Sequence, residues 1–270
     1  MDNALTANLD RLHTTAPGAE RIKRNLGLTD ADPVQWCRAI ISDKRASIVR
    51  RGKNWYIQTE GCIITVNAGS YTIITAHRQT KRSKAAMTLE TDRLILRRWE
   101  ESDAADLYEC ARDPAVGPIA GWPPHQSVSE SRNVILTVFG GAEAYAVCLK
   151  SDNRAIGAIE LKLNGCTDMT QRDDECELGY WLGRPFWGRG LMPEAAAELL
   201  RRAFEDLGMS KIWCGYYEGN TRSRRVQEKL GFKHRRTDHD TDVPLLRETR
   251  TSHVSCLTKE EWEIAKCRQK

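Results

Sequence analysis

Two different periods of apolar residues organise the first part of the chain, up to residue 78. Residues 19–26 and a segment that starts at Asp32 place apolar side chains three and four positions apart, which predicts two helices. Asp32 is the expected N-cap of the second helix, and Pro33 its first residue. The stretch "ASIVRRGKNWYIQTEGCIITVNAGSYTIITAH" then alternates apolar and polar positions between the turn-forming clusters RGKN, EG and NAGS. It predicts an antiparallel meander of about four short strands, and therefore a small α+β domain over residues 1–78.

A second pattern begins at residue 88, after the basic segment 79–87, which lacks periodicity and is expected to be an exposed linker. Short apolar runs here alternate with segments of helical period. The expected strands are residues 94–98, 144–150, 155–163, 175–182, 212–217, 232–237 and 248–257. The expected helices are residues 102–111, capped by Ser102, 127–139, with Ser127 and Glu130 as a capping box, 194–207 and 221–230. Residues 88–270 are therefore predicted to form a mixed α/β sheet with surrounding helices.

Composition narrows the class of protein. The chain is 40% hydrophobic and 29% charged, which is typical of a soluble globular protein. It shows no secretory signal and no apolar run near the roughly 20 residues of a membrane span, so a cytoplasmic location is expected. Nine cysteines are scattered without a C-x-x-C pair, which favours reduced, mostly buried thiols over disulfides or a zinc site. No metal site is predicted.

Charge separates the two parts of the chain. Residues 1–86 carry 14 Lys+Arg against 7 Asp+Glu, a net charge of +7. The remainder carries a net charge of −3, which gives +4 for the whole chain. This asymmetry suggests an acidic partner for the first domain, such as ribosomal RNA or tRNA. Arg50, Arg51 and Lys53 lie beside Trp55 and Tyr56, as on nucleic-acid-binding surfaces. A hairpin with a core tryptophan and exposed basic residues gives the same pattern.

Three stretches of the first domain also resemble a known family. "RIKRNLGL", "GKNWY" and "ITVNAGSYTIITAH" are similar to a small family of uncharacterised bacterial domains. That resemblance implies no activity for the first domain.

Two glycines flank Arg189 in "FWGRGLM", directly before the predicted helix 194–207. Gly188 and Gly190 let the backbone approach a ligand closely, and the free amides of the helix N-terminus attract anions. The pattern alone fits both a phosphate-binding turn and a plain strand-to-helix turn. The third glycine of a dinucleotide fingerprint and the Gly-Lys-Ser/Thr of a P-loop are both missing.

The surrounding stretch, "ELGYWLGRPFWGRGLMPEA", resembles the acetyl-CoA-binding segment of the GNAT superfamily of N-acetyltransferases, in which Q/R-x-x-G-x-G/A joins a strand to a helix. Pro185 stands at the first position, as in the branch that is similar to ribosomal-protein N-terminal acetyltransferases. The resemblance covers about residues 88–258 and implies acetyl-CoA as the cofactor. It assigns to cofactor binding Trp181, Leu182, Trp187, Gly188, Arg189, Gly190, Leu191, Met192, Asn220 and Ser223.

The segment "NTRSRRVQEKLGF" resembles a second GNAT motif, in which an Asn and a Ser three residues later face the pantetheine arm and the thioester. Here these residues are Asn220 and Ser223, although Asn220 alone also fits a plain N-cap. Many relatives carry a tyrosine seven residues after the Asn, where this chain has Gln227. We hypothesise that Ser223 hydrogen-bonds the departing sulfur; the alternative is that the thiolate leaves without such help.

The resemblance implies direct attack of an amine on the thioester in a ternary complex, which requires a base. "QRDDECELGYW" supplies carboxylates at the start of the strand 175–182, and period-two alternation puts Glu175, Glu177, Gly179 and Trp181 on one face. Glu177 is the first candidate base and Glu175 the second, acting directly or through a water. The alternative is a solvated edge that only attracts cations.

The acceptor pocket is expected in "GPIAGWPPHQSVSE", where Trp122 and His125 are candidate lining residues. A tryptophan packed under a proline-rich loop is an equal alternative. The branch resemblance favours a protein or peptide N-terminal α-amine as the acceptor. A small-molecule amine, such as an amino acid, polyamine or antibiotic, is the second candidate. A regulatory protein that senses acyl-CoA or binds nucleic acid without turnover is the candidate from another class.

Overall fold

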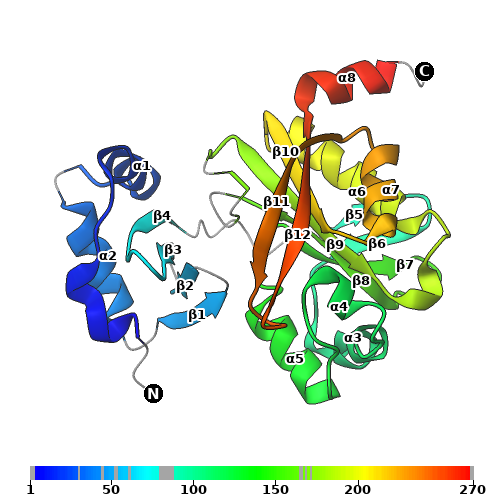
Figure 1. Cartoon of the computed structure of the whole chain (residues 1–270), viewed down its shortest axis with the longest axis horizontal. Helices are drawn as coiled ribbons and strands as arrows, with labels where there is room; N and C mark the ends of the chain where they lie inside the picture. The colour runs from blue at the N-terminus through cyan, green and yellow to red at the C-terminus, as the bar shows by residue number, and fades with distance from the viewer. Residues whose placement is uncertain are drawn as a thin grey trace. The chain divides into compact units, whose positions relative to one another are not determined.

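The chain forms two compact units, divided between residues 84 and 85 in a computed structural model (Figure 1). The structure describes residues 4–29, 31–43, 46–51, 54–59, 62–78, 88–163, 167, 169–170 and 172–267. The expected linker, residues 79–87, lies outside the described residues.

The first unit is the small α+β domain that the sequence predicts, with two helices on one face of an antiparallel sheet (Figure 1). Its elements are α1 (Ala16–Leu26), α2 (Pro33–Ile41), β1 (Ser47–Arg51), β2 (Asn54–Gln58), β3 (Cys62–Asn67) and β4 (Ile73–Arg78), with strand order β1-β2-β3-β4. The Asp32 carboxylate caps α2 by accepting a hydrogen bond of 2.8 Å from the Gln35 amide. The expected cap and first helical residue are therefore confirmed.

Trp55 belongs to the core of this unit, where it is 3% exposed and its ring lies 5.2 Å from that of Tyr71. The Arg50 guanidinium lies over the same indole, 5.9 Å from its centre. The structure therefore shows a core tryptophan with a basic neighbour, whereas Lys53 and the side chain of Arg51 lie outside the described residues, so nucleic-acid binding stays a prediction.

The second unit is built on an eight-stranded mixed sheet of order β11-β12-β10-β9-β8-β7-β6-β5. The strands are β5 (Leu89–Glu90), β6 (Leu94–Arg97), β7 (Ala144–Leu149), β8 (Ala155–Lys162), β9 (Glu175–Leu182), β10 (Lys211–Tyr217), β11 (Lys233–Val243) and β12 (Glu248–Thr258). Neighbouring strands pair antiparallel except β9 and β10, which are parallel. This is the predicted mixed α/β class, and the expected strands occur close to their predicted bounds, except that β11 continues six residues further, to Val243, and the short β5 was not expected.

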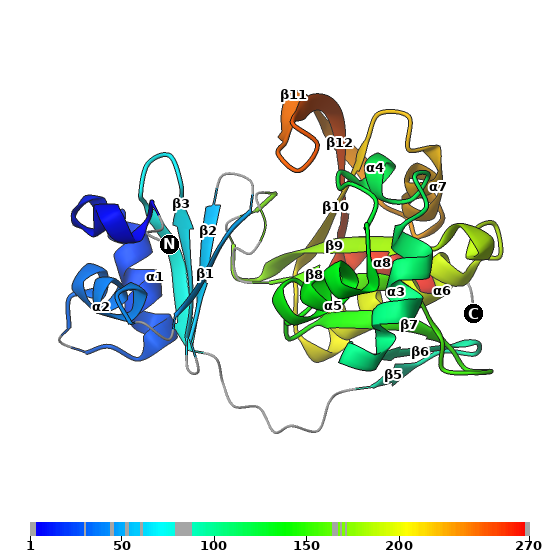
Figure 2. The same cartoon turned by 90° about the horizontal axis from the view of Figure 1, so that it is seen from below.

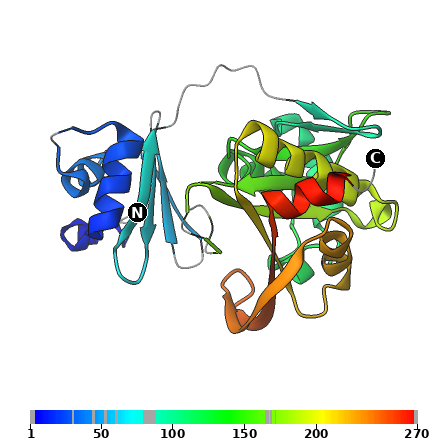
Figure 3. The ribbon, with the colours of Figure 1, turned by 90° about the horizontal axis from the view of Figure 1, so that it is seen from above.

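Helices cover both faces of this sheet. The helices α3 (Ala104–Ala111), α4 (Gly117–Ala120) and α5 (Val128–Thr137) lie on the face seen in Figure 2. On the opposite face, in Figure 3, lie α6 (Leu191–Arg201) and α8 (Lys259–Cys267). The short helix α7 (Thr221–Lys229) follows β10. The main core lies between the sheet and α6, where Leu199, Ala203 and Phe204 are fully buried.

Four helical elements differ from the expectation. The first helix of this unit is preceded by a 3₁₀ turn, and its capping box is made by Glu100 and Asp103 rather than by Ser102. The proline-rich segment expected as a loop contains α4, and α8 follows the last strand. The expected helix 194–207 begins earlier, at Leu191, and ends in a π-helical turn, Arg202–Asp206.

The described part of the chain contains no helix that is both long and apolar enough to cross a membrane. Its eight described cysteines are all free thiols, seven buried and Cys267 exposed. Burial raises the pKa of Cys176 and Cys214 to about 12, so both thiols are neutral and pack as small apolar side chains.

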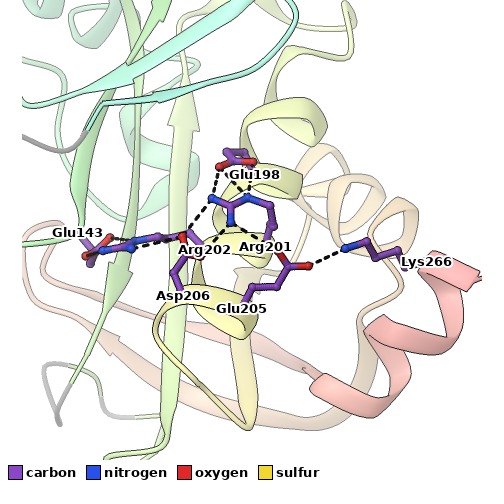
Figure 4. A network of polar contacts seen from close by, with 7 residues as sticks. All are labelled: Glu143, Glu198, Arg201, Arg202, Glu205, Asp206 and Lys266. Carbon is purple, nitrogen blue, oxygen red and sulfur yellow. Dashed lines mark hydrogen bonds and ion pairs between the residues drawn. The ribbon is translucent and has the colours of Figure 1, made fainter.

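A network of charged side chains joins the end of α6 to β7 and α8 (Figure 4). Its members are Glu143, Glu198, Arg201, Arg202, Glu205, Asp206 and Lys266. Arg202 pairs with Glu143 at 2.9 Å, and both side chains are less than 10% exposed. The Tyr145 hydroxyl donates a 2.6 Å hydrogen bond to the same Glu143 carboxylate. Lys266 and Glu205 also pair at 2.6 Å, but both side chains are more than a third exposed.

We expect the Arg202→Met substitution to destabilise the second unit by about 3 kcal/mol, because it leaves the Glu143 carboxylate buried without its counter-charge. The exposed Lys266→Met substitution is the matched control and is expected to cost less than about 1 kcal/mol. Urea unfolding followed by circular dichroism measures both. Equal losses of unfolding free energy in the two variants would contradict the prediction that the buried ion pair contributes more to stability than the exposed one.

Candidate active site

The strands β9 and β10 diverge, and this divergence creates the candidate site. They pair over three positions, from Lys211 with Glu175 to Trp213 with Glu177. Both strands continue for four or five residues beyond these pairs, to Leu182 and Tyr217. Two cavities of about 420 Å³ and 290 Å³ are lined in part by the diverging segments.

The turn before α6 has the backbone that the two glycines allow. Gly188 and Gly190 have φ angles of 73° and 74°, in the left-handed region that side chains disfavour. Gly190 is the N-cap of α6. Arg93 supports the turn, because its guanidinium donates a 3.0 Å hydrogen bond to the Arg189 carbonyl and pairs with Glu194 at 2.6 Å.

The larger cavity is lined by eight of the ten predicted cofactor residues, namely Leu182, Trp187, Gly188, Gly190, Leu191, Met192, Asn220 and Ser223. Three cations of α7, Arg222, Arg225 and Lys229, also line it. Their spacing places them on one stripe of the helix, and the Arg222 guanidinium lies 4.0 Å from the Trp187 ring centre. A cleft with glycine amides at one wall and three cations at another is suited to phosphate groups.

The other two predicted cofactor residues are placed differently. The indole of Trp181 lines the smaller cavity. Arg189 contributes its carbonyl to the bond with Arg93, and its guanidinium lies 6.0 Å from the Phe186 ring centre.

Asn220 and Ser223 meet at the start of α7. The Asn220 side chain is the N-cap and accepts a 3.2 Å hydrogen bond from the Ser223 amide, so it both caps the helix and lines the larger cavity. The Ser223 hydroxyl lies 3.0 Å from the Tyr180 hydroxyl and 3.4 Å from the Gln227 amide nitrogen. Tyr180 lines both cavities.

The smaller cavity combines aromatic rings with carboxylates. Trp122 and Trp181 lie edge to face in its wall, with ring centres 5.5 Å apart. Glu177 lines it, and one carboxylate oxygen accepts a 2.6 Å hydrogen bond from the Lys162 ammonium. The other oxygen accepts a hydrogen bond from the Thr167 hydroxyl. Ring faces and a carboxylate together suit a cationic amine.

Glu175 is held by a different set of groups at the start of β9. Its carboxylate accepts hydrogen bonds of 2.6 Å from the Trp213 indole and 2.7 Å from the Thr170 hydroxyl. Lys211 and Arg172 pair with it at 3.2 Å and 3.4 Å. Burial acts to raise its pKa, but the bonds from Trp213, Thr170 and Lys211 outweigh it and lower the pKa from its ordinary value.

His125 lies at a third cavity, of about 690 Å³, together with Cys110, Asp113 and Arg184. Its imidazole is 2.8 Å from the Ser131 hydroxyl, and burial lowers its pKa. The structure therefore brings Trp122, but not His125, into the lining of the cavity that contains Glu177.

Tyr180 and Lys162 are the site residues that sequence reasoning missed. Period-two alternation puts Tyr180 on the opposite face of β9 from Glu177, so no pattern linked it to the site. Lys162 is opposite Glu177 in the β8–β9 register, a pairing that needs the strand order to be known.

The comparisons with known protein families match both units. Residues 93–233 match the family described as "Acetyltransferase (GNAT) domain". Residues 6–77 match "Protein of unknown function (DUF3781)". Each match lies within the corresponding structural unit.

Individual acetyltransferases are also similar to this chain. The chain is 31% identical over 151 residues to the uncharacterized N-acetyltransferase p20 of Bacillus licheniformis, covering 54% of this chain and 82% of that one. It is 34% identical over 65 residues to the Bacillus subtilis (strain 168) "Putative ribosomal N-acetyltransferase YdaF", covering 24% and 36%. The crystal structure of a GNAT-family acetyltransferase from Bacillus anthracis aligns with a TM-score of 0.56 at 21% identity, covering 64% and 99%.

We expect Gly188→Ala to weaken coenzyme A binding at least about tenfold, because its methyl group would project into the larger cavity from a backbone position with nothing within 4 Å. Gly208→Ala is the matched control, since Gly208 has a φ of 70° and equally open surroundings. Each variant should lose about 1 kcal/mol of stability from the strained backbone. Calorimetric titration with coenzyme A separates them, and equal affinity losses would contradict this placement of the cleft.

Proposed function

Because the chain belongs to the acetyltransferase (GNAT) family, we propose that it transfers an acetyl group from acetyl-CoA to a primary amine by direct attack in a ternary complex. The observation that carries this proposal is the pair of cavities beside the diverging strands β9 and β10. One contains the glycine turn and the cations of α7, and the other contains Glu177. Tyr180 lines both, so two substrates can meet there.

The larger cavity fits the cofactor. Gly188 and Gly190 present no side chains to the cavity, and the amides at the start of α6 attract the pyrophosphate. Arg222, Arg225 and Lys229 supply positive charge for phosphate groups. Bound acetyl-CoA supplies an activated acetyl thioester. The backbone of Trp181 and Leu182, beyond the last β9–β10 pair, is proposed to bond its pantetheine arm.

Glu177 is proposed as the general base, and the hydrogen-bond inventory of the two carboxylates supports this choice. A carboxylate has about four acceptor positions. Among the residues that the structure describes, Glu177 has two partners, Lys162 and Thr167, and it lines the smaller cavity. Glu175 has four partners, so it has little capacity to accept a further proton.

A protein or peptide N-terminal α-amine is the proposed acceptor. Trp122 and Trp181 offer ring faces to an ammonium group, and Glu177 is positioned to take its proton. The ribosomal designation of the relative YdaF supports the same class. The volume of about 290 Å³ also suits a whole small-molecule amine, which is the second candidate acceptor.

We expect Glu177→Gln to lower kcat/KM by about 100-fold or more, because the amide cannot take the proton of the ammonium. Glu175→Gln, two positions earlier on the same strand, is the matched control and should retain most of the activity of the folded protein. Coenzyme A release is measured with N-terminal peptides, amino acids and polyamines. Tight acetyl-CoA binding without turnover on any amine would favour the regulatory alternative instead.

A further inference from the structure

The side chain of Tyr180 occupies a central position between the two cavities. Its hydroxyl lies 3.0 Å from the Ser223 side-chain oxygen and donates a 3.2 Å hydrogen bond to the Ser223 carbonyl oxygen. Its ring is also part of the lining on both sides. The strand β9 therefore delivers a hydroxyl to the first turn of α7, across the gap where β9 and β10 have parted.

Gln227 fills the helix position one turn after Ser223. It is 2% exposed, and its amide nitrogen is 3.4 Å from the Ser223 side-chain oxygen. An amide nitrogen only donates hydrogen bonds. Ser223 therefore accepts from Gln227 and cannot give its own hydrogen to that nitrogen.

The contact between the Tyr180 and Ser223 hydroxyls leaves a hydrogen for the larger cavity only when Tyr180 is the donor and Ser223 the acceptor. When Tyr180 shares its single hydrogen between the carbonyl and side-chain oxygens of Ser223 in a three-centre bond, the side-chain oxygen has two donors, and its own hydrogen is left to point elsewhere. Ser223 lines the larger cavity, so its hydrogen is available to a group bound there. Donors linked in this way polarise one another and strengthen the final hydrogen bond.

We propose that Tyr180 is a positioning residue for Ser223: it shares its hydrogen with the Ser223 side-chain oxygen, so that the Ser223 hydrogen is directed to the thioester sulfur as that sulfur leaves. This inference rests on the proposed function for its cofactor. In this arrangement the hydroxyl near Ser223 comes from Tyr180 on β9, because the helix α7 has Gln227 where many relatives have a tyrosine.

The protonation of Tyr180 agrees with a donor role. Burial is the largest influence and raises the pKa of this phenol well above its ordinary value, so the hydroxyl keeps its hydrogen throughout the neutral range. Such a group donates a hydrogen bond without releasing its proton.

The bond changes balance without a proton from Tyr180. The new bond joins the acceptor nitrogen to the acetyl carbon, and the carbon–sulfur bond breaks with its electron pair remaining on sulfur. The acceptor ammonium loses two protons in all, of which Glu177 takes the first and solvent the second. Ser223 stabilises the negative sulfur by its hydrogen bond, which is the stronger charge-assisted kind.

The thiol of bound coenzyme A reports this hydrogen bond directly. Its ionisation is followed by the ultraviolet absorbance of the thiolate in a pH titration of the complex. Relative to the wild type, we expect Tyr180→Phe and Ser223→Ala each to raise the pKa of the bound thiol by about one unit. The double variant should show no more than the larger single shift, because the two hydroxyls act in series.

Turnover gives a second readout. Tyr180→Phe should lower kcat about tenfold and leave KM for acetyl-CoA unchanged. The control is Tyr108→Phe, which removes a hydroxyl from α3 and should change neither the thiol pKa nor kcat.

Three outcomes would overturn the inference: an unchanged thiol pKa in Tyr180→Phe, fully additive shifts in the double variant, or a wild type that binds no coenzyme A. The titration needs no acceptor amine, so it is independent of the acceptor. If the thiol shifts appear but no amine is acetylated, the proposed function fails while the role of Tyr180 stands.

Discussion

The parting of β9 from β10 is the constraint on which the rest of the site depends. The two parallel strands pair over three positions and then separate, although each continues. Each is held firmly on its other side: β9 pairs with β8 at six positions and β10 with β12 at seven. The gap between β9 and β10 is therefore held open by the pairing of each strand with its other neighbour, and the walls that these strands contribute to the two cavities are fixed.

The segment that contains α4 keeps the far end of this gap in place. The Arg250 guanidinium of β12 donates a 2.6 Å hydrogen bond to the Pro118 carbonyl, and the Asn220 amide donates to that of Ile119. At Gly121, with a φ of 95°, a Cβ atom would lie 2.9 Å from the Tyr217 ring. Only a glycine allows this close approach, and the docking brings Trp122 into the lining of the smaller cavity.

The sequence predicted the sheet and the glycine turn before α6 because both depend on local patterns. Alternation marked β9, and the glycines of positive φ marked the start of α6. It ranked Glu177 before Glu175 as the candidate base but could not predict the contacts that distinguish them, because Trp213 and Lys211 lie on the neighbouring strand. The short helix α4 was missed for a similar reason, since four residues with a proline are stabilised by docking rather than by propensity.

In the proposed reaction, the departure of the sulfur needs less help from the protein than the deprotonation of the acceptor amine, and the proposed site residues fit this difference. A thiol has a pKa of about 8.5, so sulfur can leave as a thiolate, and a hydrogen bond from Ser223 is sufficient help. The acceptor side must remove a proton from an ammonium, which a carboxylate does weakly. An α-amine, with a pKa of about 8, requires less of that base than a lysine side chain at about 10.4. A site that offers Glu177 to the amine and hydroxyl groups to the sulfur is therefore better suited to an N-terminal α-amine than to a lysine.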